Sequence, residues 1–187
     1  MGEPALSCDS VETIASDAAR AGENLELKAR AVDLEKARGI AAAIGASRQG
    51  TERQVDRYFA VPAGRLKLRQ STLDGAHLVA YLRPDDHGFR VARFHRLPVT
   101  DPEGLAETLG AMLGEVARVV KEREVWWWND VRIHLDAVQG LGSFVEFEAR
   151  LDRIGDEAEA RRRLERLMRD FEITDDDVIA GSHGEMS

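Results

Sequence analysis

Cysteine is almost absent from this chain, and long apolar runs are missing altogether. Cys8 is the single cysteine among 187 residues, which excludes a disulfide within the chain and a zinc site built from cysteines alone. We therefore expect a reducing, cytoplasmic location. No apolar stretch reaches membrane-spanning length, and residues 1–22 lack the charged start and apolar middle of a signal peptide. The sequence predicts a soluble protein with no membrane partner.

Positive charge is scarce as well. The chain has 26 Lys and Arg against 34 Asp and Glu, which gives a net charge of −8. This balance argues against sequence-independent binding to nucleic acid, which needs an excess of Lys and Arg, although it allows a local basic pocket. Neither a P-loop nor a nucleophile elbow is present. The length suits one domain with a full core, and a homodimer is left open.

Alternating polar and apolar residues predict about eight strands, and three segments have helical periodicity. We expect strands at 24–30, 54–59, 65–70, 77–83, 89–97, 121–128, 131–139 and 143–150. The helices are expected at 33–44, 102–113 and 156–171. The predicted domain spans 23–180, between a flexible extension at 1–22 and a flexible tail at 181–187.

The most informative segment is 121–150, which predicts two successive hairpins. Residues 129–130, Asn-Asp, favour a two-residue turn. A tight turn there pairs Trp128 with Val131, and the same register puts Arg123 directly across from Asp136.

The second hairpin is expected to have a three-residue loop at 140–142, with its last glycine in the left-handed conformation. That register puts Asp136 opposite Glu146 and His134 opposite Glu148. Two opposed carboxylates repel each other, so a cation should lie between them. The alternative is that this face is the solvent-exposed side of an antiparallel sheet, where charged residues of both signs are common. These strands alone leave both interpretations open.

Charged residues also alternate along the other predicted strands. If the sheet closes into a barrel, these faces line its interior and form a charged tunnel. A tunnel lined mainly by Lys and Arg needs a polyanion to offset its self-repulsion, and phosphates fit best. Its carboxylates would suit Mg²⁺ or Mn²⁺, which prefer oxygen ligands and bridge phosphate oxygens. The pattern therefore predicts chemistry on a phosphate chain.

Several motifs resemble those of the CYTH superfamily, the triphosphate tunnel metalloenzymes, and are most similar to class IV adenylate cyclase-like bacterial proteins. The motifs are NLELK (24–28), QVDRYF (54–59), LKLR (66–69), YLRPD (81–85), VKER (120–123) and RIHLDAVQGLGSFVEFE (132–148). They follow one another in order over about 24–179.

The resemblance implies an α+β fold, an eight-stranded antiparallel barrel with a charged interior and flanking helices. It implies a divalent-metal-dependent enzyme that cyclises ATP or hydrolyses thiamine triphosphate, inorganic triphosphate or an RNA triphosphate end. The metal-site residues would be Glu26, Asp136, Glu146 and Glu148. The triphosphate contacts would be Lys28, Lys67, Arg69, Arg83, Lys121 and Arg123, with Arg93 and Arg132 added mainly from strand alternation. Lys28 could instead act as a catalytic general base.

Two departures from the family pattern affect these expectations. Asn24 stands where the motif has its first glutamate, which removes a negative charge and puts a second metal in doubt. The tail, GSHGEMS, lacks a tyrosine that relatives often carry. A non-catalytic sensor that binds a nucleotide or polyphosphate is therefore the alternative function. His134 is expected to support the metal ligands through a hydrogen bond rather than to bind metal.

Overall fold

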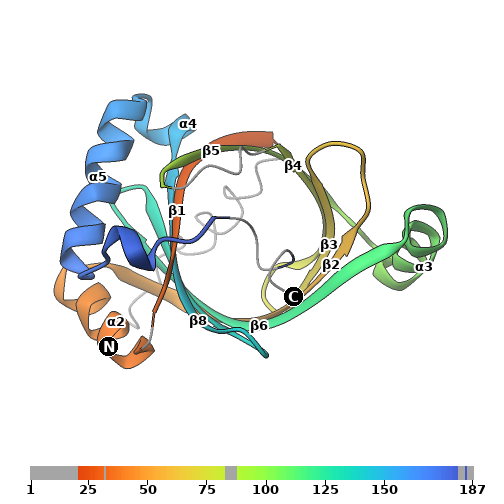
Figure 1. Cartoon of the computed structure of the whole chain (residues 1–187), viewed down its shortest axis with the longest axis horizontal. Coiled ribbons are helices and arrows are strands. Elements are labelled where there is room, and N and C mark those ends of the chain that lie inside the picture. Colours follow the sequence, from red (N-terminus) through yellow and green to blue (C-terminus); the bar gives the residue numbers. More distant parts are fainter. Residues whose placement is uncertain (1–20, 32, 83–87, 181–183, 185–187) are drawn as a thin grey trace, which may run out of the picture.

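Antiparallel strand pairing runs round a complete circle in this protein (Figure 1). The computed structural model describes residues 21–31, 33–82, 88–180 and 184. Its strands are β1 (Ala21–Arg30), β2 (Ser47–Phe59), β3 (Arg65–Ser71), β4 (Gly75–Leu82), β5 (Arg90–Pro98), β6 (Glu115–Trp128), β7 (Val131–Val138) and β8 (Gly142–Arg150). Its helices are α2 (Leu34–Ala43), α3 (Pro102–Leu113), α4 (Leu151–Ile154) and α5 (Glu157–Asp170), with a 3₁₀ turn at Asp175–Asp177.

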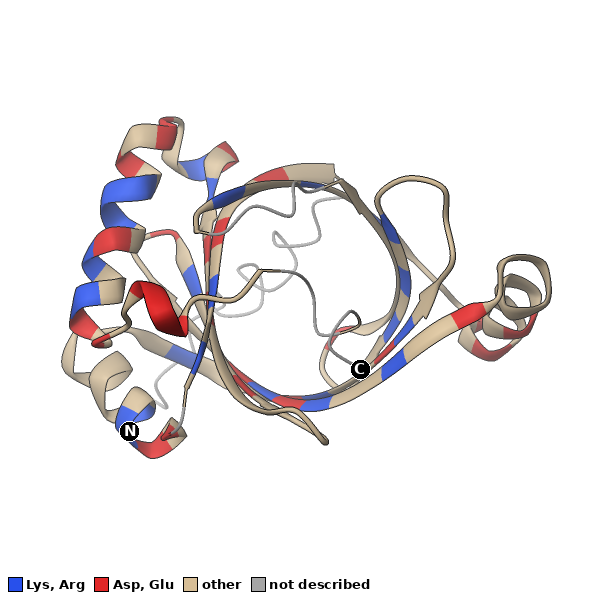
Figure 2. Ribbon diagram, viewed as in Figure 1, with Lys and Arg blue, Asp and Glu red and all other residues tan. Residues whose placement is uncertain are grey.

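The strands follow the order β1-β5-β4-β3-β2-β6-β7-β8, and β8 pairs with β1 to close the barrel. The predicted eight-stranded antiparallel barrel is therefore confirmed. An open sheet with a wet charged face is wrong, because Arg123 and Glu146 are only 4% and 6% exposed. Closure leaves alternate residues of every strand facing inward, and Figure 2 shows Lys, Arg, Asp and Glu on strands all round the opening.

The main hydrophobic core lies outside the barrel rather than within it. Leu27 and Phe147 are cross-strand partners on the outer face of β1 and β8, and they pack in one cluster with Leu164 and Leu167 of α5. Helices α2, α4 and α5 cover this side, while α3 lies on the opposite side of the barrel (Figure 1). The helices thus pack against the outside of the barrel, and most of its interior is occupied by polar side chains.

One end of the barrel interior is apolar. Tyr58, Val119, Val138 and Phe144 form a separate buried cluster, with Ile179 packed against it. Strand alternation places the first four on the same faces as the charged residues. These side chains fill that end of the interior and confine the polar space to the rest of the barrel.

The first predicted hairpin is confirmed. Asn129 and Asp130 have φ angles of 46° and 59°, which a two-residue hairpin turn with both central residues left-handed requires. Trp128 pairs with Val131. The resulting register brings two inward-facing charges of opposite sign together on β6 and β7.

The second predicted register is wrong by two residues. Val138 pairs with Gly142, so His134 lies opposite Glu146 and Asp136 lies opposite Phe144. The loop is 139–141 instead of 140–142, and its left-handed glycine is Gly140, with φ 78°. A shift of two residues keeps every side chain on its expected face, so the error changes neighbours but not sides.

Two strands are longer than the sequence indicates, and a short helix is added. Strands β2 and β6 pair from Ser47–Trp127 to Phe59–Glu115. The added segments are mostly polar in composition, and the backbone hydrogen bonds between the two strands stabilise them. Helix α4 follows β8 directly.

Some predictions lie outside the described residues. These are Arg83, residues 1–20 of the predicted extension and most of the predicted tail. The last two residues of that extension, Ala21 and Gly22, belong to β1. Within the part of the chain that the structure describes, no helix combines the length and apolar character needed to cross a membrane.

Candidate functional site

The barrel interior contains a cavity of about 250 Å³ that is lined by side chains from all eight strands. Most of the lining residues are charged, and several are almost completely buried. Such side chains are stable in a closed interior only when they are paired or bind a ligand of opposite charge.

The first group of cations lies on β6 and is held by a carboxylate on β7. Asp136 is 0% exposed. It accepts two hydrogen bonds of 2.7 Å from Arg123 and one of 3.1 Å from Lys121. The guanidinium of Arg123 reaches further and donates to Glu146 at 2.7 Å. We call Asp136 with Arg123 and Lys121 the β6 clamp.

A second group has the same construction on β2 and β3. Asp56 is 2% exposed and accepts two hydrogen bonds of 2.7 Å from Arg69 and one of 3.0 Å from Lys67. We call Asp56 with Arg69 and Lys67 the β3 clamp. It has the same Lys-x-Arg spacing as the β6 clamp and the same bidentate contact between arginine and aspartate. Because β2 pairs with β6, the two clamps lie on one continuous part of the wall.

The clamps determine the ionisation of their members. Burial alone would raise the pKa of Asp136, but Arg123 and Lys121 outweigh it and hold that pKa far below its usual range. The pKa of Asp56 is lowered in the same way against burial, by Arg69 and Lys67. Burial, reinforced by the neighbouring arginine, lowers the pKa of Lys67 to about 8 and that of Lys121 to about 7. An anion in the cavity would therefore favour the charged form of both lysines.

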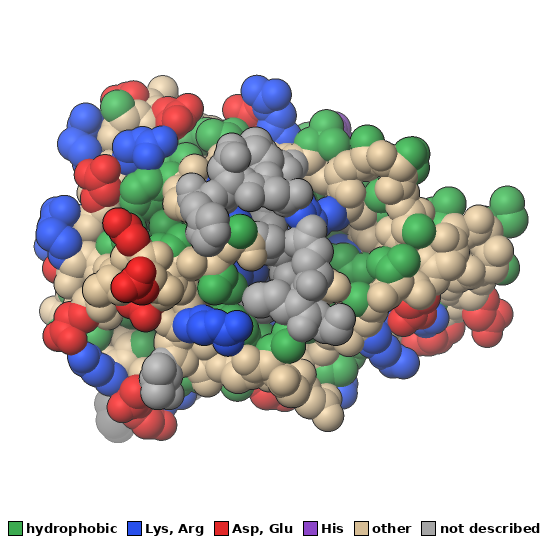
Figure 3. All heavy atoms as spheres, in the orientation of Figure 1, with side chains coloured by type: hydrophobic (Ala, Val, Ile, Leu, Met, Phe, Trp, Pro, Cys, Tyr) green, Lys and Arg blue, Asp and Glu red, His purple; other side chains and the backbone are tan. Residues whose placement is uncertain are grey.

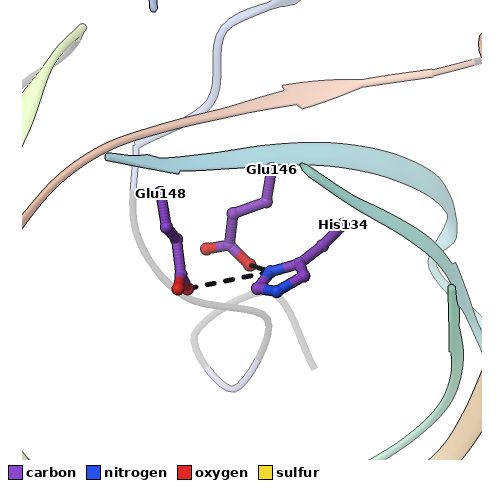
Figure 4. A group of neighbouring side chains, drawn as sticks. All are labelled: His134, Glu146 and Glu148. Atoms are coloured by element: carbon purple, nitrogen blue, oxygen red, sulfur yellow. Dashed lines mark ion pairs between the residues drawn. The ribbon is translucent and has the colours of Figure 1, made fainter. Parts of the chain in front are cut away.

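Carboxylates gather on the neighbouring part of the wall. Glu146 and Glu148 of β8 lie beside His134 of β7 (Figure 4), and one possible ligand atom from each lies within 4.8 Å of the others. The Nδ1 atom of His134 is 3.7 Å from an oxygen of each glutamate and makes no hydrogen bond of ordinary length within the described part of the chain. Burial and Arg123 lower the pKa of His134, which favours the neutral imidazole that can bind metal.

Strand β1 completes this region. Glu26 pairs across strands with Glu148, and Lys28 pairs with Glu146, where its ammonium lies 3.2 Å from a carboxylate oxygen. Lys28 lowers the pKa of Glu146 well below its usual range, although burial opposes this effect. Both β8 glutamates are thus anions that face the cavity.

This donor set fits a divalent cation. Glu146 and Glu148 offer the oxygen ligands that Mg²⁺ and Mn²⁺ prefer, and Glu26 is the cross-strand neighbour that would add a third carboxylate. An imidazole is more typical of transition metals than of Mg²⁺. The role of His134 as a hydrogen-bonded support stays a prediction; its Nδ1 atom lies 3.7 Å from an oxygen of each glutamate.

Two of the predicted site residues do not lie where the sequence suggested. Asp136 belongs to the β6 clamp and not to the carboxylate group, because the two-residue register shift moves it away from Glu146. The side chain of Arg93 is 71% exposed and pairs with Glu23. Alternation explains this error, since Ala92 and Arg96 line the cavity and residue 93 must face outward.

The other predicted residues that the structure describes do line the cavity. These are Glu26, Lys28, Lys67, Arg69, Lys121, Arg123, Arg132, Glu146 and Glu148. Arg132 lies 3.2 Å from Glu148. Sequence reasoning missed Asp56, although its alternation with Gln54 and Tyr58 was visible, because a single aspartate in a strand gives no sign of its partners.

Comparisons with known proteins agree with this arrangement. The sequence model of the CYTH domain family matches residues 23–182. A protein of Methanocaldococcus jannaschii named "putative adenylate cyclase" is 25% identical over 134 residues, which are 71% of this chain and 75% of that protein.

Two solved structures are also similar in fold. The PH1012 protein of Pyrococcus horikoshii has a TM-score of 0.76 and 23% identity, over 87% of this chain and 98% of that one. A "putative adenylyl cyclase" from Hippeastrum, described as having a dominant triphosphatase activity, has a TM-score of 0.60 and 14% identity, over 80% and 88% of the two chains. At these identities the likeness shows the fold alone.

The clamps generate a prediction about Asp56, which holds the β3 cations in place. The substitution Asp56→Asn adds positive charge to the cavity but releases Arg69 and Lys67 from their two-pronged anchor. We expect the loss of positioning to outweigh the added charge, so that the Kd for tripolyphosphate rises about tenfold, or about 1.4 kcal/mol. Isothermal titration calorimetry measures it. The matched control is Glu115→Gln, which removes a carboxylate paired with Arg57 on the outer surface. Tighter binding by a folded Asp56→Asn protein would show that charge, not position, governs affinity.

The lowered pKa of Lys67 generates a second prediction. Tripolyphosphate should raise this pKa from about 8, because an anion stabilises the ammonium form. At about pH 8 the wild type should therefore take up more protons on binding than Lys67→Met does. At about pH 6 the difference should vanish, since Lys67 is already protonated. Titration calorimetry in buffers of different ionisation enthalpy measures the number of protons taken up. Subtracting the value for the variant from that for the wild type removes the protons taken up by the ligand itself. Equal uptake at pH 8 would contradict the role of Lys67.

Proposed function

This chain belongs to the CYTH domain family, and we propose that it is a divalent-metal-dependent enzyme that acts on a small-molecule triphosphate. The observation that carries the proposal is the meeting of two opposite charge arrays in one closed cavity. The clamps on β3 and β6 present cations, and β8 presents Glu146 and Glu148. Phosphoryl transfer needs this division, with cations on the phosphate oxygens and carboxylates for a metal.

Two reactions suit such a site. A class IV adenylate cyclase-like enzyme converts ATP to cyclic AMP and pyrophosphate, by attack of the ribose 3′-hydroxyl on the α-phosphorus. A triphosphatase uses water to attack the terminal phosphorus of thiamine triphosphate or inorganic triphosphate. The Methanocaldococcus relative is named for the first activity and the Hippeastrum protein is described by the second. We propose the shared class of triphosphate chemistry, and both activities stay open within it.

The roles of the residues follow from their positions. In our proposal Arg69, Lys67, Arg123 and Lys121 bind and orient the phosphate oxygens, while Asp56 and Asp136 keep those side chains aligned. Glu146 and Glu148 would hold Mg²⁺ or Mn²⁺, with His134 and Glu26 adjacent. When bound, the metal would neutralise charge on the reacting phosphate and orient the nucleophile. Several of the charged side chains that line the site are almost completely buried, which strengthens the charge interactions among them.

Binding without turnover is the alternative function, and Asn24 is the observation that favours it. Its side chain lines the cavity, and its amide oxygen makes no hydrogen bond to any residue that the structure describes. A neutral amide in place of a glutamate would weaken a metal site. A sensor for a nucleotide or polyphosphate would need the cations of the clamps but no complete metal site.

Product analysis tests the proposal directly. The purified protein is incubated with Mg²⁺ or Mn²⁺ and with ATP, thiamine triphosphate or tripolyphosphate in turn. We expect cyclic AMP or orthophosphate, and Glu148→Gln should lower the rate at least about 100-fold because a bound metal supplies several kcal/mol of stabilisation. Glu115→Gln, outside the barrel, should keep the wild-type rate. Tight binding with no product would select the sensor, and neither binding nor product would refute a triphosphate site.

Lys28 has two candidate roles that one pair of variants separates. Its contact with Glu146 places it between the two charge arrays, and we expect it to contact phosphate rather than to remove a proton. Arginine keeps the positive charge but cannot act as a base at neutral pH. Lys28→Arg should therefore retain activity within about tenfold of wild type, well above Lys28→Met. If both variants bind tripolyphosphate yet are equally inactive, Lys28 is the general base.

A further inference from the structure

The cavity wall carries a further pair of an arginine and an aspartate, outside the two clamps. Arg96 of β5 and Asp74, in the turn between β3 and β4, both line the cavity. The Nη2 atom of Arg96 donates a hydrogen bond to Oδ2 of Asp74. We call these two side chains the entrance pair. Neither belongs to a clamp or to the carboxylate group on β8 and β1.

The entrance pair lies at the end of the cavity that opens to solvent. Along β3, Lys67 pairs with Tyr58 of the apolar cluster that fills one end of the barrel, whereas Ser71 pairs with Gln54, further from that cluster. The turn that carries Asp74 follows Ser71 and therefore lies toward the opposite end. The side chain of Asp74 is 55% exposed although it lines the cavity. A ligand that enters here passes the entrance pair before it reaches the clamps.

The contact between Arg96 and Asp74 is much less secure than those in the clamps. Asp56 and Asp136 are almost completely buried, and each accepts two hydrogen bonds from an arginine and one from a lysine. In the described part of the chain, the carboxylate of Asp74 accepts only from Arg96, through a single nitrogen. An exposed ion pair of this kind contributes little to stability. A competing anion can therefore replace the carboxylate at small cost.

His77 of β4 links the entrance pair to the β3 clamp. It is the cross-strand partner of Arg69, and its Nδ1 and Nε2 atoms lie 3.1 Å and 3.2 Å from Nη2 of Arg96. Burial and the charge of Arg96 lower the pKa of His77, so the ring is neutral at neutral pH and adds no positive charge. Arg96 thus continues the row of guanidinium groups from the β3 clamp toward the opening.

We propose, on the basis of the proposed function, that Arg96 binds an entering phosphate group and that this phosphate replaces Asp74 as its partner. A guanidinium group binds phosphate oxygens through two parallel hydrogen bonds, whereas Asp74 occupies only one of its nitrogens. The released carboxylate of Asp74 is hydrated at the surface, where its charge is stable. Before the ligand arrives, Asp74 neutralises Arg96. Arg96 is therefore a substrate-binding residue at the entrance, and the contact with Asp74 competes with the substrate.

Binding of tripolyphosphate without metal, measured by titration calorimetry, tests the inference. Arg96→Met should raise the Kd about tenfold, because a charge-assisted contact is lost. Asp74→Asn should lower the Kd about threefold, because the phosphate no longer competes with a carboxylate. This change is opposite in sign to the one expected for Asp56→Asn, whose aspartate is buried and positions its cations. In the double variant, Asp74→Asn should change the Kd of Arg96→Met by less than about twofold, because Asp74 acts through Arg96.

The matched control is Arg93→Met, which removes the same charge from the outer face of the same strand and should keep the Kd within about twofold of wild type. Thermal melting confirms that each variant is folded. An unchanged Kd for Arg96→Met would overturn this inference and leave the proposed function intact. So would weaker binding by Asp74→Asn, or an equal gain from Asp74→Asn when residue 96 is methionine, which would show that Asp74 repels the ligand directly. Failure of the wild type to bind tripolyphosphate, with or without Mg²⁺, would overturn both.

Discussion

The structure depends on the neutralisation of buried cations by buried carboxylates. The closed barrel turns the charged faces of most of its strands inward, where an unpaired ion costs several kcal/mol. Asp56 and Asp136 meet this constraint by each holding one arginine and one lysine. The apolar core can then lie outside the barrel, under α2 and α5. Stability comes from the outer face, and the inner face is free to bind charged ligands.

The composition of the cavity wall follows the strand order. The clamps occupy β2, β3, β6 and β7, and the carboxylates of Glu26, Glu146 and Glu148 lie on β1 and β8. Strands β4 and β5 contribute the aromatic Tyr81 and Phe94 together with the charged Arg96. In the space-filling view, some blue side chains are visible near the middle of the face shown (Figure 3). A triphosphate with a bound metal has parts that match the clamps and the carboxylates. This correspondence between ligand chemistry and wall composition links the fold to the proposed function.

Much of this organisation could be predicted from the sequence, because alternation fixes which face a side chain occupies. Arg123 opposite Asp136 followed from a two-residue turn and is confirmed. The second hairpin failed because 140–142 contains two glycines, Gly140 and Gly142, and either can be left-handed. Arg93 failed because three arginines spaced by three residues cannot share one strand face. The β3 clamp was not predicted, since strand pairing that brings Asp56 to Arg69 depends on the tertiary register.

The most direct test of the central claim is a crystal structure of the protein grown with Mn²⁺ and tripolyphosphate, with anomalous scattering used to locate the metal. We expect the manganese peak inside the barrel beside Glu146 and Glu148, and the phosphates between that peak and the guanidinium groups of Arg69 and Arg123. A fully occupied ligand bound on the outer surface, or a metal peak distant from the β8 glutamates, would contradict the account.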